Sequence, residues 1–318
     1  MMRSRGVLVL CGLLGVLAGW ACRADEPDTA SPVTATVATS AGATTTDRHP
    51  ADEPIQIPGV TAILEQYRED EIQGLISVKT TNRSTSTIVF EDLRLVWPGI
   101  GAAEPLVRST QLSPGVQFDV RVRQGAAVCG DPPVTTSSAP TDDAIAVGRA
   151  TIDGSSPRLV AVPIDDEYAI LQRVFARSCQ DQRVRWAADL RFGDTWTPST
   201  TASGEPAVLG TIELRRNRSD EELTITEING SVLLRIGPAT PSDPVVRLAP
   251  GDDAATIPIR IEQSGNCADH ALAESKKTFI IPIDLAIGGA ESLAYTIRFD
   301  TAAQLILNPM INESCGVG

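Results

Sequence analysis

The chain has few of the residues that most enzyme sites require. Only two of its 318 residues are histidines, His49 and His270, and aromatic residues make up only 4%. A histidine-based zinc site or a Ser-His-Asp triad needs several partners held together in space. His49 lies in a polar N-terminal region, and His270 is interpreted as a solvated residue of a loop. The sequence therefore offers no recognisable catalytic set, and we expect no catalytic residue and no enzyme activity.

Nucleotide and metal motifs are missing as well. The sequence contains no GxxxxGK[ST] stretch, no GxGxxG stretch and no CxxC pair. Glycine-rich loops of the first two kinds hold phosphates, and CxxC spacing is typical of zinc and redox cysteines. We expect no cofactor and no metal ion.

Positive charge is also in short supply. The chain carries 27 Lys and Arg against 40 Asp and Glu, which gives a net charge of -13. Removal of an N-terminal segment with Arg3 and Arg5 would take away two positive charges and leave -15. Because such a surface repels phosphate backbones, we expect no nucleic acid as a partner.

Acidic residues leave one enzymatic alternative open. Adjacent pairs occur at Asp142-Asp143, Asp165-Asp166, Glu221-Glu222 and Asp252-Asp253. Two acids on opposite walls of a cleft hydrolyse glycosides, but adjacent acids point to opposite sides of a strand or lie in turns. A hydrolase with its site at a domain junction would use Asp165 or Asp252. Trp186 or Trp196 would then be its sugar platform. Calcium at Gly251-Asp252-Asp253 would lack the twelve-residue ligand loop.

The N-terminus has the three regions of a secretory signal peptide. Residues 1–5 carry two arginines, residues 6–21 are apolar without a charge, and small residues surround the end of that run. This apolar run is too short to span a bilayer comfortably. We predict a signal peptide over residues 1–21 and an exported protein.

The end of the predicted signal, Leu17-Ala18-Gly19-Trp20-Ala21-Cys22, resembles a bacterial lipobox. The resemblance implies lipidation of Cys22 and attachment to the outer side of a cell membrane. It is imperfect, since Gly19 and Trp20 occupy the places of the usual leucine and small residue. The alternative is cleavage after Ala21 or Ala24 and secretion of a soluble protein.

Residues 22–54 are predicted to be a disordered stalk. From Asp25 to Pro54 the composition is dominated by Thr, Ala, Ser, Pro and Asp. Such a segment buries too little apolar surface to offset the entropy of ordering. As a coil of about 30 residues, it would reach roughly 30 Å.

The remaining sequence repeats with an offset of 135 to 138 residues. The matches are Asn82-Arg83-Ser84 with Asn217-Arg218-Ser219, Leu112-Ser113-Pro114-Gly115 with Leu248-Ala249-Pro250-Gly251, Cys129 with Cys267, Gly154 with Gly289, Asp165 with Asp300, and Ser178-Cys179 with Ser314-Cys315. A nearly constant offset over a hundred residues indicates duplication of one structural unit. We predict copy one over residues 55–200 and copy two over residues 207–318.

Each copy reads as a series of short strands. In residues 116–122, for example, Val116, Phe118, Val120 and Val122 alternate with polar residues, so one face is buried and the other is wet. The expected strands are 75–79, 87–96, 116–122, 145–152 and 159–164 in copy one, and 209–214, 223–236, 255–261, 278–285 and 293–299 in copy two.

The run of strand, Asn-x-Ser turn, strand, Leu-x-Pro-Gly and strand covers about 50 residues in each copy. It resembles the immunoglobulin-like domains of bacterial envelope proteins. The resemblance implies two tandem antiparallel β-sandwiches with a binding or spacing role and an unknown protein or glycan partner. The chain departs from antibody-type domains because Trp97 precedes Cys129 and copy two contains no tryptophan.

One short helix is predicted in copy one, after the acidic residues 165–167 and through residues 170–179. In copy two, Asn308-Pro309 should end the equivalent helix early. Residues 183–196 are predicted to be a last strand of copy one that copy two lacks. Residues 55–73 have no counterpart and are expected to fill that gap or to bridge the copies.

Four cysteines occupy equivalent positions in the two copies. This predicts the disulfides Cys129–Cys179 and Cys267–Cys315, with Cys11 in the signal and Cys22 left over for the lipid. Taken together, the sequence predicts a non-enzymatic envelope lipoprotein that binds a partner or spaces other components from the membrane.

Overall fold

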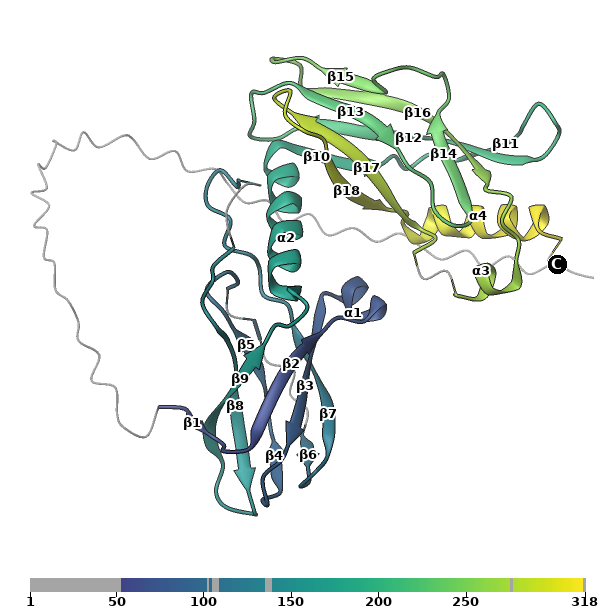
Figure 1. The fold of residues 1–318 in the computed structure, drawn as a ribbon. Helices are drawn as coiled ribbons and strands as arrows, with labels where there is room; N and C mark the ends of the chain where they lie inside the picture. The colour runs from purple at the N-terminus through teal and green to yellow at the C-terminus, as the bar shows by residue number, and fades with distance from the viewer. Residues whose placement is uncertain (1–52, 102, 105–108, 135–138, 275–276, 317–318) are drawn as a thin grey trace, which may run out of the picture. The chain divides into compact units, whose positions relative to one another are not determined.

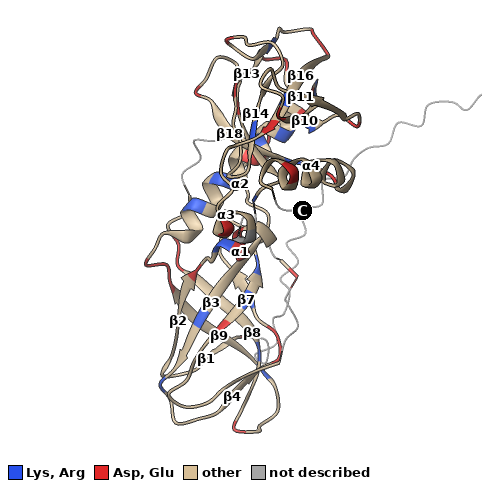
Figure 2. Ribbon diagram, turned by 90° about the vertical axis from the view of Figure 1, so that its right-hand side faces the viewer, with Lys and Arg blue, Asp and Glu red and all other residues tan. Residues whose placement is uncertain are grey.

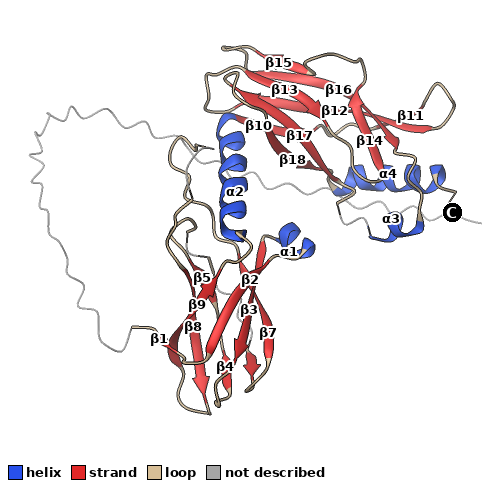
Figure 3. Ribbon diagram, in the orientation of Figure 1, coloured by secondary structure: helices blue, strands red, loops and turns tan. Residues whose placement is uncertain are grey.

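The computed structural model describes residues 53–101, 103–104, 109–134, 139–274 and 277–316. These described residues all belong to one compact unit. The predicted signal peptide, Cys22 and nearly all of the predicted stalk lie outside the described residues. The described part is mainly β, as the sequence predicts (Figures 1 and 3).

The first part of this unit is built on one nine-stranded sheet with the order β6-β4-β8-β9-β2-β3-β7, in which β1 pairs with β9 and β5 with β8. Its elements are β1 (Ile55–Gln56), β2 (Val60–Glu65), α1 (Arg68–Gln73), β3 (Leu75–Asn82), β4 (Ile88–Phe90), β5 (Arg94–Val96), β6 (Thr110–Leu112), β7 (Gln117–Arg123), β8 (Ala144–Ile152), β9 (Arg158–Asp165) and α2 (Ile170–Ala187).

The second part has two sheets with the orders β10-β12-β16-β14 and β15-β13-β17-β18, and β11 pairs with β12. Its elements are β10 (Ala188–Phe192), β11 (Thr197–Thr200), β12 (Pro206–Arg216), β13 (Leu223–Ile228), β14 (Leu234–Pro238), β15 (Val246–Leu248), β16 (Ala254–Gln263), α3 (Asp269–Glu274), β17 (Ile280–Ile287), β18 (Leu293–Arg298) and α4 (Thr301–Ser314).

The strand pairing repeats along the chain, as the sequence repeat predicts. Ile88 pairs with Ile152 across β4 and β8, and the residues 135 positions later, Leu223 and Ile287, pair across β13 and β17. With shifts of 135 or 136 residues, three further ladders correspond: Val78–Val120 to Glu213–Thr256, Ile88–Leu112 to Leu223–Leu248, and Ile145–Pro163 to Ile280–Arg298. The two parts therefore share one register in four ladders.

The repeated Leu-x-Pro-Gly turns have the same backbone shape. Gly115 before β7 has a φ of 75°, and Gly251 before β16 has a φ of 92°. A side chain would be strained at such angles, so glycine is needed at both places.

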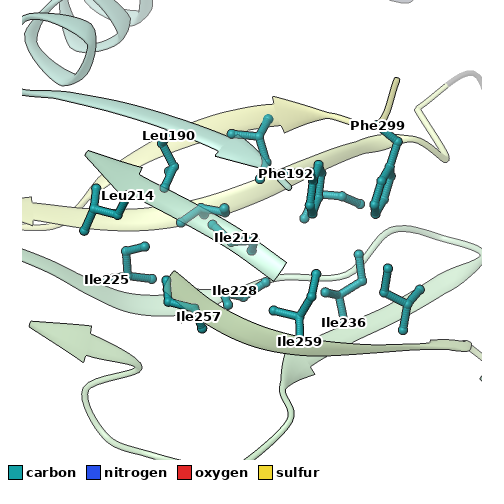
Figure 4. Close-up of a cluster of buried hydrophobic side chains, with 14 of the residues drawn as sticks. Leu190, Phe192, Ile212, Leu214, Ile225, Ile228, Ile236, Ile257, Ile259 and Phe299 are labelled. Carbon is teal, nitrogen blue, oxygen red and sulfur yellow. The ribbon is translucent and has the colours of Figure 1, made fainter. Parts of the chain in front are cut away.

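Apolar faces of both sheets in the second part enclose one core, in a sandwich-like arrangement. Ile212 and Ile259 come from one sheet, whereas Ile225 comes from the other (Figure 4). At one end, Phe192 and Phe299 stack with their ring centroids 3.9 Å apart. The first part has a separate core, which includes Leu64, Val78 and Phe90 and also the start of α2.

The boundary predicted between the copies is wrong. The expected strand over residues 183–196 does not close copy one, because α2 runs without a break to Ala187. The chain then forms β10 and β11, which pair with β12 in the second part. Residues 188–200 therefore supply the first strands of copy two.

The first strands of copy one lie in the predicted bridging segment, residues 55–73. β1 and β2 pair in parallel with β9, and β2 pairs antiparallel with β3. The first sheet is thus mixed, and not wholly antiparallel as expected. Each copy begins with extended segments beside its first long strand. Copy two was expected to lack a last strand because residues 188–200, which begin copy two, had been assigned to the end of copy one.

The prediction that Asn308-Pro309 would end the helix of copy two is also wrong, because α4 continues to Ser314. Pro309 lies on the exposed side, where water can bond the carbonyl group that proline leaves free. Met310 and Ile311 remain buried beyond it, so packing holds the last turn.

Candidate functional site

Helix α2 is the element that positions the candidate site, and its N-terminus is held by a side chain. The Asp166 carboxylate accepts hydrogen bonds from the backbone nitrogens of Ile170 and Leu171, at 2.7 Å and 2.9 Å. These donors would otherwise have no partner in the first turn. The helix is therefore capped from four residues upstream of its first residue.

The buried face of α2 belongs to both cores. Near its start, Ile170 and Val174 pack in the first core. Near its end, Val184 and Ala187 pack in the second core. The disulfide from Cys179 to Cys129 ties the middle of the helix to the first part. These contacts fix which face of α2 is left for solvent.

The remaining face carries a stripe of charged residues at four-residue intervals. Arg173, Arg177, Asp181 and Arg185 follow one another at this spacing. Residues four apart on a helix lie on the same side, so these side chains project together. Blue segments mark the arginines of α2 in Figure 2.

Strand β18 lies against α2 and supplies a further arginine. Ile297 points into the core, so its neighbours Thr296 and Arg298 point to the opposite face of the strand. Together with the stripe they line a cavity of about 660 Å³, which we call the arginine groove. Its lining consists of Gln66, Glu71, Gln124, Arg173, Val174, Arg177, Ser178, Asp181, Arg185, Thr296 and Arg298.

Most of the arginines in the groove lack a carboxylate partner. Arg177 forms an ion pair with Glu71. Arg173 donates a hydrogen bond to the backbone oxygen of Tyr168. Within the described part of the chain, Arg173, Arg185 and Arg298 have no carboxylate oxygen within 4.0 Å. Three exposed guanidinium groups therefore face one groove of an acidic protein.

Two carboxylates in the groove differ in their environment. A hydrogen bond from Lys277, at 2.8 Å, lowers the pKa of Glu71, and Arg177 acts in the same direction. Burial raises the pKa of Asp181, against the opposing effect of Arg185 and Arg177. The negative charge of Glu71 is thus balanced by Lys277 and Arg177, whereas the charge of Asp181 is poorly compensated.

A second cavity of about 420 Å³ adjoins the arginine groove and shares Glu71, Arg177, Thr296 and Arg298 with it. We call it the apolar pocket because of its four aliphatic or proline side chains. These are Ile72 of α1, Val232 of the loop before β14, and Ile280 and Pro282 of β17. Val232 is 53% exposed.

The acids and tryptophans of the enzymatic alternative line neither cavity. Asp165 is exposed at the end of β9, and Asp252 accepts a hydrogen bond from the backbone nitrogen of Ala249 within a turn. The ring of Trp186 lies 4.9 Å from the guanidinium carbon of Arg183. Trp196 packs on Phe192 and Phe299 at the edge of the core.

The other adjacent acids have local structural roles. Asp142 accepts a hydrogen bond from the Trp97 indole through its backbone oxygen, and Glu221 pairs with Arg183. His270 lies exposed on α3. In the described ranges, no group of three or more His, Cys, Asp or Glu residues could hold a metal ion.

Both predicted disulfides are formed, Cys129–Cys179 and Cys267–Cys315. Disulfides persist in oxidising compartments, so they indicate an exported protein. Among the helices that the structure describes, none is both long and apolar enough to cross a membrane.

No family model matches the sequence, and no curated protein matches it. The B domain of a biofilm associated protein is 8% identical with a TM-score of 0.22, over 78% of this chain and 88% of that chain. CBD12 from CALX1.2 is 9% identical with a TM-score of 0.15, over 73% and 80%. The exo-chitosanase CsxA of Amycolatopsis orientalis is 12% identical with a TM-score of 0.17, over 75% and 26%. Scores this low carry no argument about fold or function.

Sequence reasoning missed the arginine groove. The spacing of Arg173, Arg177 and Arg185, by four and then eight residues, was available as a signal. This spacing was not recognised as a binding surface because a charged helix face is ordinarily only solvated. Arg298 lies more than a hundred residues later, and nothing in the sequence places it beside α2.

Proposed function

We propose that this chain is a non-enzymatic, exported binding protein whose arginine groove receives an anionic ligand. The observation that carries the proposal is the set of three guanidinium groups, those of Arg173, Arg185 and Arg298, that face one groove without a carboxylate partner among the described residues. Guanidinium groups match carboxylates and phosphates in geometry and charge. Their mutual repulsion is relieved when an anion binds between them.

The proposal includes two tandem immunoglobulin-like sandwiches as the scaffold. In the first part β3 lies between β2 and β7, and β8 lies between β4 and β9. Immunoglobulin-like sandwiches have the same neighbours, with strand B between A and E and strand F between C and G. The shared register of the second part supports the same assignment there.

We also propose that Cys22 is lipidated and holds the protein on the outer side of a cell membrane. The support is the lipobox-like sequence and the fact that Cys129, Cys179, Cys267 and Cys315 pair with one another. Replacing Cys22 with serine should release the protein from washed membranes into the soluble fraction. An unchanged membrane fraction for Cys22→Ser would contradict lipid anchoring at this residue.

The binding proposal is tested with anionic and uncharged polymers. Poly-L-glutamate, polygalacturonate and phosphatidylglycerol vesicles serve as anionic probes, and dextran serves as the uncharged probe. We expect at least one anionic probe to bind, and dextran not to bind. Loss of Arg185 and Arg298 together should weaken binding by about 100-fold, since a hydrogen bond to a charged group contributes about 1.5 kcal/mol or more.

The matched control is Arg158→Gln. Arg158 is exposed on β9 in the first part, and it lines neither cavity. This change removes one positive charge, as Arg185→Gln and Arg298→Gln each do, and should leave binding unchanged. If Arg158→Gln weakens binding as much as Arg185→Gln and Arg298→Gln do, the ligand responds to net charge and the groove is not the site.

A further inference from the structure

The arginine groove and the apolar pocket share Glu71, whose charge is balanced by Lys277 and Arg177, and also Arg177, Thr296 and Arg298, although the remainder of their linings differs in character. A ligand bound in the groove would therefore present part of its surface to Ile72, Val232 and Ile280. From this juxtaposition we infer that the ligand is an acidic polypeptide segment that places an aliphatic side chain in the apolar pocket. This inference rests on the proposed function and specifies its ligand.

The lining of the apolar pocket favours one aliphatic side chain over a lipid tail. Within the described part of the chain, its apolar wall comes from four residues on α1, the loop before β14 and β17. The rest of the lining is Gly230 together with the polar and charged residues Glu71, Arg177, Ser231, Lys277, Thr296 and Arg298. A long acyl chain would need an extended apolar channel, whereas a single leucine-sized group fits between a few aliphatic side chains.

The linings also argue against a glycan. Among the residues that the structure describes, no aromatic side chain lines either cavity. Sugar rings bind commonly on aromatic faces, which supply a flat apolar platform. A peptide needs no such platform, because its carboxylates bind guanidinium groups and its apolar side chain fills a pocket.

The loop that carries Val232 is held in position. The Ser264 hydroxyl donates a hydrogen bond to the Val232 backbone oxygen at 2.7 Å, and the backbone nitrogen of Ser264 donates to the Leu233 oxygen at 3.0 Å. The apolar wall therefore exists before the ligand arrives. A preformed pocket loses less conformational entropy on binding.

Binding of synthetic peptides to the full-length protein tests the inference. The first peptide carries two glutamates that flank one leucine in a glycine and serine background. A second peptide has glycine in place of the leucine, and a third has glutamines in place of the glutamates. We expect the first peptide to bind about tenfold more tightly than the second, which corresponds to burial of one aliphatic side chain. The third should not bind measurably.

Two protein variants assign the leucine to the apolar pocket. Val232→Ser should remove most of the difference between the first and second peptides. Val116→Ser is its control, because Val116 is also exposed, at 42%, but lines neither cavity. Circular dichroism of both variants checks that the fold is unchanged.

Equal binding of the leucine and glycine peptides, with both weakened by Arg298→Gln, would overturn this inference and leave the proposed anion site intact. Arg298-dependent binding of polygalacturonate or phosphatidylglycerol vesicles, with no peptide binding, would do the same. Failure of every anionic probe would overturn the proposed function and this inference together.

Discussion

The Asp166 carboxylate lies 2.7 Å from the backbone nitrogen of Ile170 and so completes the first turn of α2. Because α2 packs in both cores, this cap affects the stability of both parts of the unit. Asp166→Ala should lower the free energy of unfolding by about 1 to 2 kcal/mol, the usual cost of losing a helix cap. Urea denaturation followed by circular dichroism measures the loss. Glu167→Ala, one residue along and exposed, is the control and should change stability little.

The disulfide from Cys129 to Cys179 closes a loop with a sequence separation of 50. In the chain-entropy model, loss of a disulfide that closes a loop of this size lowers the free energy of unfolding by roughly 4 kcal/mol. The double variant Cys129→Ala with Cys179→Ala should therefore unfold at a markedly lower urea concentration. Peptide mapping without reductant should find Cys129 joined to Cys179 and Cys267 joined to Cys315. A disulfide between a cysteine of the first part and one of the second part would contradict this pairing.

Glu71 should make stability depend on pH. The hydrogen bond from Lys277 holds the folded-state pKa of Glu71 below its ordinary value. The stabilisation is therefore present above the unfolded-state pKa, and it is lost as pH falls through the lower folded-state pKa. Glu71→Gln should cost about 1 kcal/mol at pH 7 and nothing at low pH. Unfolding curves from pH 7 to pH 3 measure the difference, and a cost that stays constant with pH would contradict it.

Asp181 should change the pH dependence of stability in the opposite direction. Burial raises the folded-state pKa of this carboxyl group, so its contribution to stability decreases as pH rises from the unfolded-state pKa through the folded-state pKa. Asp181→Asn should therefore raise stability at neutral pH, which thermal denaturation at pH 7 measures.

The same change should strengthen anion binding. It removes a negative charge from the arginine groove, which should tighten binding of poly-L-glutamate by about fivefold, or about 1 kcal/mol. Asp284→Asn is the control, because Asp284 lies on β17 and lines neither cavity. Weaker binding by Asp181→Asn would show that its carboxylate holds the arginines in position.

Local sequence patterns predicted much of this structure. Alternation of apolar and polar residues located the long strands, because one buried face selects every second residue. The matching Cys129 and Cys267, with Cys179 and Cys315, predicted both disulfides. The Leu-x-Pro-Gly pattern predicted turns at Gly115 and Gly251, and both glycines have the positive φ that glycine adopts easily.

What the sequence could not determine was which distant segments meet. Arg185 and Arg298 line one groove because α2 ends in the second core and lies against β18, and that contact depends on packing between elements far apart in the chain. Likewise, residues 188–192 resemble a strand in either copy, and only pairing with β12 assigns them to the second. The sequence by itself determined most of the long strands, the repeat and the two disulfides. Tertiary packing alone decided where the copies divide and where the unpaired arginines converge.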